Sequence, residues 1–565
     1  MISVLQFSEV KCKDCYKCVR YCPVKSISIV NHQAQIIEED CILCGTCTLV
    51  CPQESKSDIS RVPIVKSALK SGAKLIVSVA PSYAAYFKLE TIEPLRRALM
   101  KLGFVDLTET AAGAYMVKTA YEKLMDEGGD TLVSSCCSTL NMYVKRHMPE
   151  AIPFMAPVDT PIRAHAKLLK REHPEYRVVF LTPCISKKAE CDELGSPVDF
   201  VITFDEMHQW LQEEGIELEE QKAAEDDKLT SRLFAIGGGI LRTMKRKEGI
   251  GYASVDGFDN CVRTLKDIVA GKLKGYFIEM NACEGSCIGG QSFRKLEASP
   301  VLSRLSVEKT APEVSDLTKD FNVGEDMDIR TRFVSSHVEL MQPTEKQIKK
   351  IMEKMGKHSK EDELNCSMCG YPSCRDKAIA VYFGRAEVDM CLPYMKARAE
   401  SFSDKTINMT PNAIIAVDND LRIQQVNKAA CDIFQVSAED VIGQPVSRVL
   451  DDFDFVELIS NNQSVSKKKY AYLADYNVYV EEQFQYDSDN KLTICVMRNI
   501  TQERQRKNQL KQAKMRAAHM ADELSEKQQR VVHEIASLLG ETAAETKVAI
   551  TELKETILMG DEDEE

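Results

Sequence analysis

Two cysteine runs decide the fold at the start of the chain: residues 12–23 read CKDCYKCVRYCP, and residues 41–52 read CILCGTCTLVCP. Both follow the spacing C-x2-C-x2-C-x3-C-P, in which closely spaced thiolates wrap one metal unit and the fourth cysteine crosses over to the other cluster. The sequence therefore predicts two [4Fe-4S] clusters, with two structural zinc knuckles as the alternative. The predicted ligand sets are Cys12, Cys15, Cys18 and Cys51 for one cluster, and Cys41, Cys44, Cys47 and Cys22 for the other.

The overall composition indicates a protein of a reducing compartment. The chain has 565 residues, 21 of them cysteines, and its 73 Lys and Arg against 86 Asp and Glu give a net charge of −13. This acidic balance argues against nucleic acid or an anionic membrane as the main partner. No apolar run reaches the roughly 18 residues that span a bilayer, and the segment before Cys12 is too short for a secretory signal. We therefore expect a cytoplasmic, multidomain protein whose patterned cysteines bind metal or carry redox chemistry.

The middle of the chain has the pattern of an α/β domain. Apolar runs rich in Val and Ile end where a cysteine or a polar cluster begins, in KLIVSVAPSYAAYF (74–87), RVVFLTPC (177–184) and GYFIEMNAC (275–283). Helical stretches such as AYMVKTAYEKLMDE (114–127) lie between them. Sheets of this kind commonly bind ligands at the ends of their strands, so we expect the site there.

Three stretches that are far apart in sequence carry a more specific signal. They are SSCCS (134–138), TPCISKKAE (182–190) and IEMNACEGSCIGGQ (278–291). They resemble, in order, the three signature motifs of [FeFe]-hydrogenases: T-S-C-C-P, M-P-C-x-x-K-x-x-E, and E-x-M-A-C-x-x-G-C-x-x-G-G-G-Q. Residues 1–60 in turn resemble a bacterial two-cluster ferredoxin.

The resemblance to [FeFe]-hydrogenases implies an H-cluster, in which a [4Fe-4S] cubane is joined to a diiron unit with CO, CN− and an azadithiolate bridge. Its cubane ligands would be Cys137, Cys184, Cys283 and Cys287, the last of which would bridge to the diiron unit. The cyanides would be contacted by Ala80, Pro81, Ser82 and Lys187. The catalytic residues would be Lys187, Glu190 and Cys136, whose thiol would pass the proton outward.

The departures from the family motifs point to slow turnover. Ser138 stands in place of the proline after the cysteine pair, Asn281 in place of a methionine, and Thr160–Arg163 reads TPIR in place of S-P-Q-Q. The helix before the pair lacks the two glutamates that relay protons in fast members, and Ala156 occupies the position of the relay serine. Related iron-sulfur assembly proteins, which keep the cubane ligands without a diiron unit, are the alternative. The presence of Cys136 and Lys187 favours the diiron interpretation.

A further cysteine pattern follows at residues 366–391, which reads C-x2-C-x4-C-x16-C. It resembles the single [4Fe-4S] module of some membrane redox complexes and corrinoid proteins, and a zinc site is the alternative. The expected ligands are Cys366, Cys369, Cys374 and Cys391. Because a catalytic hydrogenase needs no cluster downstream of its active site, we expect this one to carry a redox state onward.

The last part of the chain has the pattern of a signalling protein. Residues 405–501 alternate strand, turn, strand and helix, and they resemble a PAS domain. Beyond them, a seven-residue apolar step through Leu510, Leu524 and Leu538 predicts a coiled coil. A single amphipathic helix on the PAS surface is the alternative. Too few residues follow the phosphoacceptor-like box at His533 for an ATP-binding domain, so we expect no kinase in the same chain.

The sequence thus predicts a multidomain α/β and α+β protein. Its expected parts are a two-cluster ferredoxin-like domain, an H-cluster α/β domain, a [4Fe-4S] module, a PAS domain, and a coiled-coil helix with an acidic tail, at residues 1–60, 61–345, 346–400, 401–501 and 502–565. A sensory [FeFe]-hydrogenase is the favoured function, and a catalytic hydrogenase linked to ferredoxin is the competing one. Expected partners are H2 and protons, ferredoxin or a similar electron carrier, diiron maturation proteins, a separate phosphatase or kinase, and a second copy of the chain through the coil.

Overall fold

The computed structural model describes residues 3–558 apart from 129, 220, 223–226, 313–319, 322, 324–326 and 462–466, so the acidic tail predicted after Gly560 lies outside the described residues. The chain divides into two compact units, Met1–Met395 and Lys396–Glu565, and each is described by itself. All the cysteines predicted to bind metal belong to the first unit.

The ferredoxin-like segment consists of two short antiparallel ribbons and two short helices. Helices α1 and α2 each begin behind a residue in the left-handed region, Tyr16 at φ 56° and Gly45 at φ 73°, so the chain turns sharply between successive cysteines. The helices pack against each other. The bounds are β1 (Leu5–Phe7) paired with β4 (Lys56–Asp58), β2 (Ile27–Val30) paired with β3 (Gln33–Ile36), α1 (Lys17–Tyr21) and α2 (Thr46–Val50).

The next segment contains two parallel sheets, as the α/β pattern predicts. The four-stranded sheet has the order β6-β5-β8-β9, and the three-stranded sheet has the order β10-β11-β7. All five residues of β5, LIVSV, are buried, because helices cover both faces of this strand. The bounds are β5 (Leu75–Val79), β6 (Asp106–Glu109), β7 (Leu132–Val133), β8 (Arg177–Thr182), β9 (Phe200–Thr203), β10 (Gly251–Asp256) and β11 (Tyr276–Asn281).

The helices of this segment pack closely around the sheets. A Cβ on Gly113 of α6 would lie 2.0 Å from the Pro161 carbonyl oxygen at the start of α8, so only glycine allows this approach. The bounds are α3 (Val62–Lys70), α4 (Tyr83–Tyr86), α5 (Glu93–Lys101), α6 (Ala111–Asp126), α7 (Ser138–His147), α8 (Pro161–Glu172), α9 (Ser186–Cys191), α10 (Phe204–Glu213), α11 (Gly239–Thr243), α12 (Phe258–Val269), α13 (Gln291–Lys295) and α14 (Pro300–Glu308).

The four-cysteine module completes the first unit. Helix α15 (Glu345–Lys354) packs on α16 (Cys374–Tyr382), which begins at one of the predicted ligands. The side chain of Ser373 caps α16 by accepting a hydrogen bond from the Asp376 amide. The division between the two units falls within helix α17 (Leu392–Met409).

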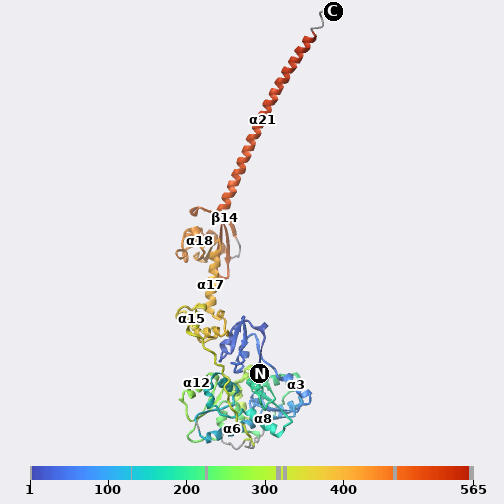
Figure 1. Cartoon of the computed structure of the whole chain (residues 1–565), viewed down its shortest axis with the longest axis vertical. Helices are drawn as coiled ribbons and strands as arrows, with labels where there is room; N and C mark the ends of the chain where they lie inside the picture. The colour runs from blue at the N-terminus through green and yellow to red at the C-terminus, as the bar shows by residue number, and fades with distance from the viewer. Residues whose placement is uncertain are drawn as a thin grey trace, which may run out of the picture. The chain divides into compact units, whose positions relative to one another are not determined.

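The second unit contains a five-stranded antiparallel sheet and a long terminal helix. The strand order is β13-β12-β16-β15-β14, and the apolar face of the sheet packs against short helices. Helix α21 (Thr501–Leu558) follows as one continuous helix of 58 residues (Figure 1). The other bounds are β12 (Ala413–Asp418), β13 (Ile423–Val426), α18 (Lys428–Phe434), α19 (Ala438–Val441), α20 (Phe453–Asn461), β14 (Lys467–Leu473), β15 (Val478–Asp487) and β16 (Leu492–Asn499).

Candidate functional site

The structure brings nine of the ten residues predicted for the active site to the wall of one cavity. Four parallel strands, β5, β7, β8 and β11, deliver them just beyond their carboxyl ends, where such sheets bind ligands. Glu190 is the exception and lies behind Lys187. The nine residues are Ala80, Pro81, Ser82, Cys136, Cys137, Cys184, Lys187, Cys283 and Cys287.

The four predicted cubane ligands act on one another electrostatically. The charges of Cys137 and Cys184 both raise the pKa of the Cys287 thiol, although burial is the larger cause of its rise to about 12. All four thiols line the same cavity, and four thiolates are the ligand set that a [4Fe-4S] cubane takes.

The cavity wall also contains a buried hydroxyl without a partner. Ser82 is fully buried in the A-P-S turn behind β5, and its Oγ has no hydrogen-bond partner among the described residues. A buried polar group of this kind costs free energy unless something satisfies it. Its orientation toward a ligand cavity fits a small polar ligand such as cyanide.

Lys187 forms a buried ion pair with Glu190. The Nζ of Lys187 donates to Glu190 Oε2 at 2.6 Å, and the hydroxyls of Ser138 and Thr160 also donate to this carboxylate. Burial opposes charge on the amine, but the carboxylate outweighs it and raises the pKa of Lys187. Ser138 and Thr160 are two of the departures from the family motifs. Their hydroxyls donate hydrogen bonds to Glu190, and this contact explains both residues. Glu190 itself does not line the cavity, and its carboxylate holds the Lys187 ammonium from behind.

Cys136 contacts a tyrosine that the sequence interpretation did not single out. The Tyr121 hydroxyl, on α6, lies 3.2 Å from Cys136 Sγ and 2.9 Å from Ser135 Oγ, and it accepts a hydrogen bond from the Ser135 amide. Burial raises the pKa of the Cys136 thiol to about 12, so the group is a protonated thiol at neutral pH. The helical period of α6 could have placed Tyr121 on the buried face, but its partner depends on the tertiary fold.

Glu279 is the glutamate that opens the third motif, and the sequence analysis assigned it no role. It is fully buried on β11, where it accepts hydrogen bonds from the amides of Gly238 and Leu241. Burial raises the pKa of its carboxyl to about 7, and its charge acts on Cys136. A glutamate inside an apolar strand was the available signal, since buried carboxylates are rare without a role.

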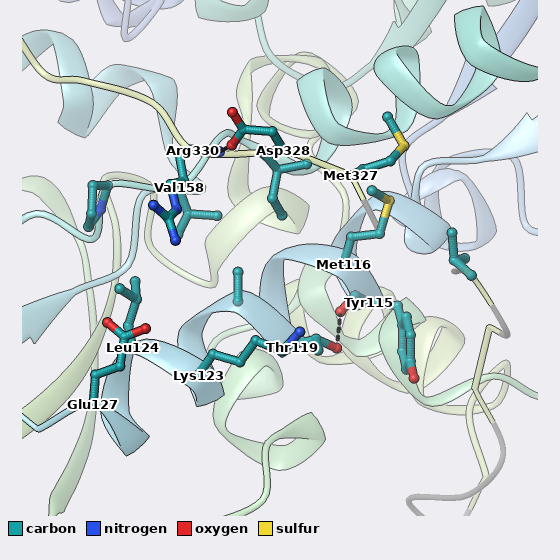
Figure 2. Close-up of a pocket in the computed structure, with 14 residues that line it drawn as sticks. Tyr115, Met116, Thr119, Lys123, Leu124, Glu127, Val158, Met327, Asp328 and Arg330 are labelled. Atoms are coloured by element: carbon teal, nitrogen blue, oxygen red, sulfur yellow. Dashed lines mark hydrogen bonds between the residues drawn. The ribbon is translucent and has the colours of Figure 1, made fainter. Parts of the chain in front are cut away.

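A separate hollow of about 670 Å³ borders the other face of α6. Figure 2 shows Tyr115, Met116, Thr119 and Lys123 of α6 along this hollow, with Arg330 on the opposite wall. The Thr119 hydroxyl donates back to the Tyr115 carbonyl at 3.0 Å. None of the residues within α6 that line this hollow is a glutamate, although Glu127, the C-cap residue of the helix, lines it as well.

The other predicted cysteines also form groups. Cys366, Cys369, Cys374 and Cys391 line one pocket together with Lys377. In the ferredoxin-like segment, the charges of Cys44, Cys41 and Cys22 all act on Cys47. Lys56 acts on both Cys18 and Cys51, and Cys15 acts on Cys18. Lys56 also acts on Cys47, so the cysteines of both predicted sets lie near one another in this segment, and the crossed assignment of the ligands stays a prediction.

Comparison with protein families decides the class of the chain. Residues 73–291 match the iron only hydrogenase large subunit, C-terminal domain, and residues 402–527 match the PAS fold. The chain is an [FeFe]-hydrogenase-like protein with a PAS domain. Residues 11–55 match a 4Fe-4S dicluster domain and residues 362–393 match an Fe-S cluster family. The predicted ferredoxin-like, hydrogenase-like, iron-sulfur and PAS parts are confirmed.

The individual relatives of this hydrogenase-like protein include a hydrogenase and an iron-sulfur assembly protein. The periplasmic [Fe] hydrogenase large subunit of Nitratidesulfovibrio vulgaris is 25% identical over 367 residues, which are 51% of this chain and 86% of that protein. Cytosolic iron-sulfur assembly component 3 of Mus musculus is 22% identical over 397 residues, 54% of this chain and 83% of that protein. An apo [FeFe]-hydrogenase structure from Chlamydomonas reinhardtii covers 50% of this chain and 100% of its own, at 16% identity and a TM-score of 0.37.

None of the helices among the described residues combines the length and apolarity needed to cross a membrane.

Proposed function

We propose that this hydrogenase-like protein is a slow, sensory [FeFe]-hydrogenase that reports H2 or redox state through its PAS domain and its terminal helix. The observation that carries the proposal is the single cavity at the strand ends, which combines the four cubane cysteines with Cys136, Lys187 and the Ala80–Ser82 turn. The iron-sulfur assembly relatives are the alternative. Cys136 and Lys187 favour a diiron unit, because a cubane alone has no use for a second thiol and an ammonium.

The proposed roles follow from the chemistry of the side chains. Cys137, Cys184, Cys283 and Cys287 would hold the cubane, and the diiron unit would supply the chemistry that splits or forms H2. Lys187 would donate hydrogen bonds to one cyanide, held in place by Glu190. The unsatisfied Ser82 hydroxyl would donate to the other.

Slow turnover follows from what lies behind Cys136. The proton leaving this thiol meets the Tyr121 hydroxyl, whose pKa is raised by burial far above its usual value. A carrier works best when its pKa lies near the operating pH, and a general acid-base group typically contributes about 10² to 10⁴ in rate. A pathway that begins with a tyrosine should therefore run more slowly than one that begins with a glutamate.

The terminal helix supports an output role. Apolar residues Leu510, Leu524 and Leu538 of α21 are each about 60% exposed and follow one another at two-heptad spacing. Such an apolar seam is stable in water only when another helix covers it. We propose that a second copy of the chain pairs with α21, and that a separate phosphatase or kinase reads the pair. Ferredoxin or a similar carrier would exchange electrons with the amino-terminal clusters, and maturation proteins would insert the diiron unit.

The experiment that tests this proposal measures hydrogen exchange in the full-length, matured protein under H2 and under argon. A ligand can shift a conformational equilibrium only through differential affinity for its states. We expect exchange or crosslinking within α21 to change under H2, together with turnover roughly 10² or more below that of hydrogenases with a complete relay. Fast turnover with an unchanged α21 would identify a catalytic hydrogenase instead.

A further inference from the structure

We propose that the four-cysteine module at 366–391 takes its electron from one particular ferredoxin-like set, the set of Cys22, Cys41, Cys44 and Cys47, across an interface built for that contact. In this transfer one cluster is oxidised by one electron and the other is reduced by one electron. No covalent bond is made or broken, and no proton moves. The interface is formed by the chain's own residues. Only the source of the electron, H2, rests on the proposed function.

The closest contact of the interface involves a glycine. Gly370, which follows Cys369, has a φ of +94°, and a Cβ added there would lie 2.9 Å from Val19 Cγ1 and 3.0 Å from the Arg20 amide. Val19 and Arg20 belong to α1, which carries Cys18 of the other ferredoxin-like set, but they lie on the side of Cys18 that leads to the C-cap, Cys22. Only glycine lets the backbone beside Cys369 reach the helix that ends at Cys22.

Polar contacts fix the module on both sides of this glycine. Arg20 Nη1 donates to the Met368 carbonyl at 3.0 Å. The Ile29 amide, on β2, donates to the Arg385 carbonyl at 2.9 Å, and the Arg385 guanidinium pairs with Asp40 at 2.7 Å. These three polar contacts indicate that the four-cysteine module and the ferredoxin-like segment have a fixed arrangement.

Two side chains serve both cysteine sets at once. Lys25 Nζ donates to the Val19 and Arg20 carbonyls, both at 3.0 Å, and its charge interacts with Cys22 and Cys369. Tyr371 is 5% exposed, and its hydroxyl has no hydrogen-bond partner among the described residues. The charges of Cys369 and Cys22 both act on Tyr371. The unsatisfied hydroxyl fits a donor to a cluster sulfur, which is a common way to tune a cluster's potential.

The same ferredoxin-like set also faces the active-site domain. Gln291 Nε2 donates to Thr48 Oγ1 at 3.0 Å, and Arg294 Nη2 donates to the Cys44 carbonyl at 3.1 Å. Both residues belong to α13, shortly after Cys287. The set of Cys22, Cys41, Cys44 and Cys47 is therefore in contact with the active-site domain through α2 and with the module through α1.

Two matched variants test the interface in the full-length, cluster-loaded protein. Gly384 lies in the same module with a φ of +67°, and nothing lies within 4 Å of a Cβ placed there. Gly370→Ala and Gly384→Ala thus share the backbone strain, and only Gly370→Ala displaces α1. After chemical reduction with dithionite, pulsed electron paramagnetic resonance should show spin coupling between the module and its neighbour in the parent and in Gly384→Ala. We expect Gly370→Ala to lose this coupling while its iron content is unchanged.

Two cysteine variants identify the partner set. Cys15→Ala removes a ligand of the other ferredoxin-like set, and Cys44→Ala removes a ligand of the proposed partner. Coupling that survives Cys15→Ala and disappears in Cys44→Ala supports the proposal, whereas the reverse result, or unchanged coupling in Gly370→Ala, overturns it. Dithionite reduces the clusters without the active site. If dithionite produces the spin coupling but H2 reduces none of the clusters, the result would confirm this inference and count against the proposed function.

Discussion

The Tyr121 hydroxyl lies 3.2 Å from the sulfur of Cys136 and is, among the described residues, the hydrogen-bond partner of that thiol. Under the proposed function, this hydroxyl is the group that would take the proton from Cys136, because helix α6 lacks the glutamates expected at the relay positions. The proposed slow turnover would then have its physical cause at this contact.

Replacing Tyr121 by phenylalanine should lower H2 oxidation about 10²-fold, the lower end for a lost acid-base group. The measurement is turnover with an artificial electron acceptor in the matured protein. Tyr115→Phe is the matched control, because Tyr115 lies on the same helix and lines the separate hollow. If both variants retain full turnover, protons leave Cys136 by another route.

Replacing Cys136 by alanine should keep the infrared bands of CO and CN− and remove most turnover, because the substitution deletes a proton carrier and no ligand. The expected loss is at least about 10²-fold. Cys261→Ala is the control, since Cys261 is a fully buried free cysteine that does not line the cavity. Loss of the bands in Cys136→Ala would show that this thiol is needed to hold the diiron unit.

His165 should make the protein less stable in mild acid. The side chain is buried against Ser78, with Nδ1 2.8 Å from the hydroxyl, and burial lowers its pKa from 6.5 to about 4. Between pH 6.5 and pH 4 the unfolded chain binds a proton at His165 and the folded chain does not. The contribution of His165 to the free energy of unfolding is therefore complete above pH 6.5 and is lost as the pH falls toward 4. From pH 7.5 to 5.5 this lowers the free energy of unfolding by about 1 kcal/mol.

Urea unfolding of the full chain at the two pH values measures the effect, with His165→Gln as the comparison. Acid-labile clusters affect both proteins alike, so the difference between them isolates the histidine. Equal pH dependence in the two proteins would mean that His165 is protonated in the folded state.

The sequence predicted those features that depend on local spacing. The two cysteine runs predicted the dicluster segment, because their spacing is specific to paired [4Fe-4S] clusters. The apolar runs that end at Cys184 and Cys283 predicted where the strands deliver the site. Contacts between distant segments could not be predicted: Gly370 meets Val19 only in the folded chain, and Glu190 meets Ser138 and Thr160 across three elements. Their residue types have no periodic signature, so only the tertiary fold shows them.

Infrared spectroscopy of the anaerobically matured full-length protein tests the central claim most directly. Bound CO and CN− absorb where protein does not, and their bands report a diiron unit independently of turnover. The account predicts these bands in the parent protein and their loss in Cys287→Ser, whose side chain would no longer bridge the two parts of the H-cluster. A protein that carries its [4Fe-4S] clusters but shows no such bands after maturation would contradict the account and favour the assembly-protein alternative.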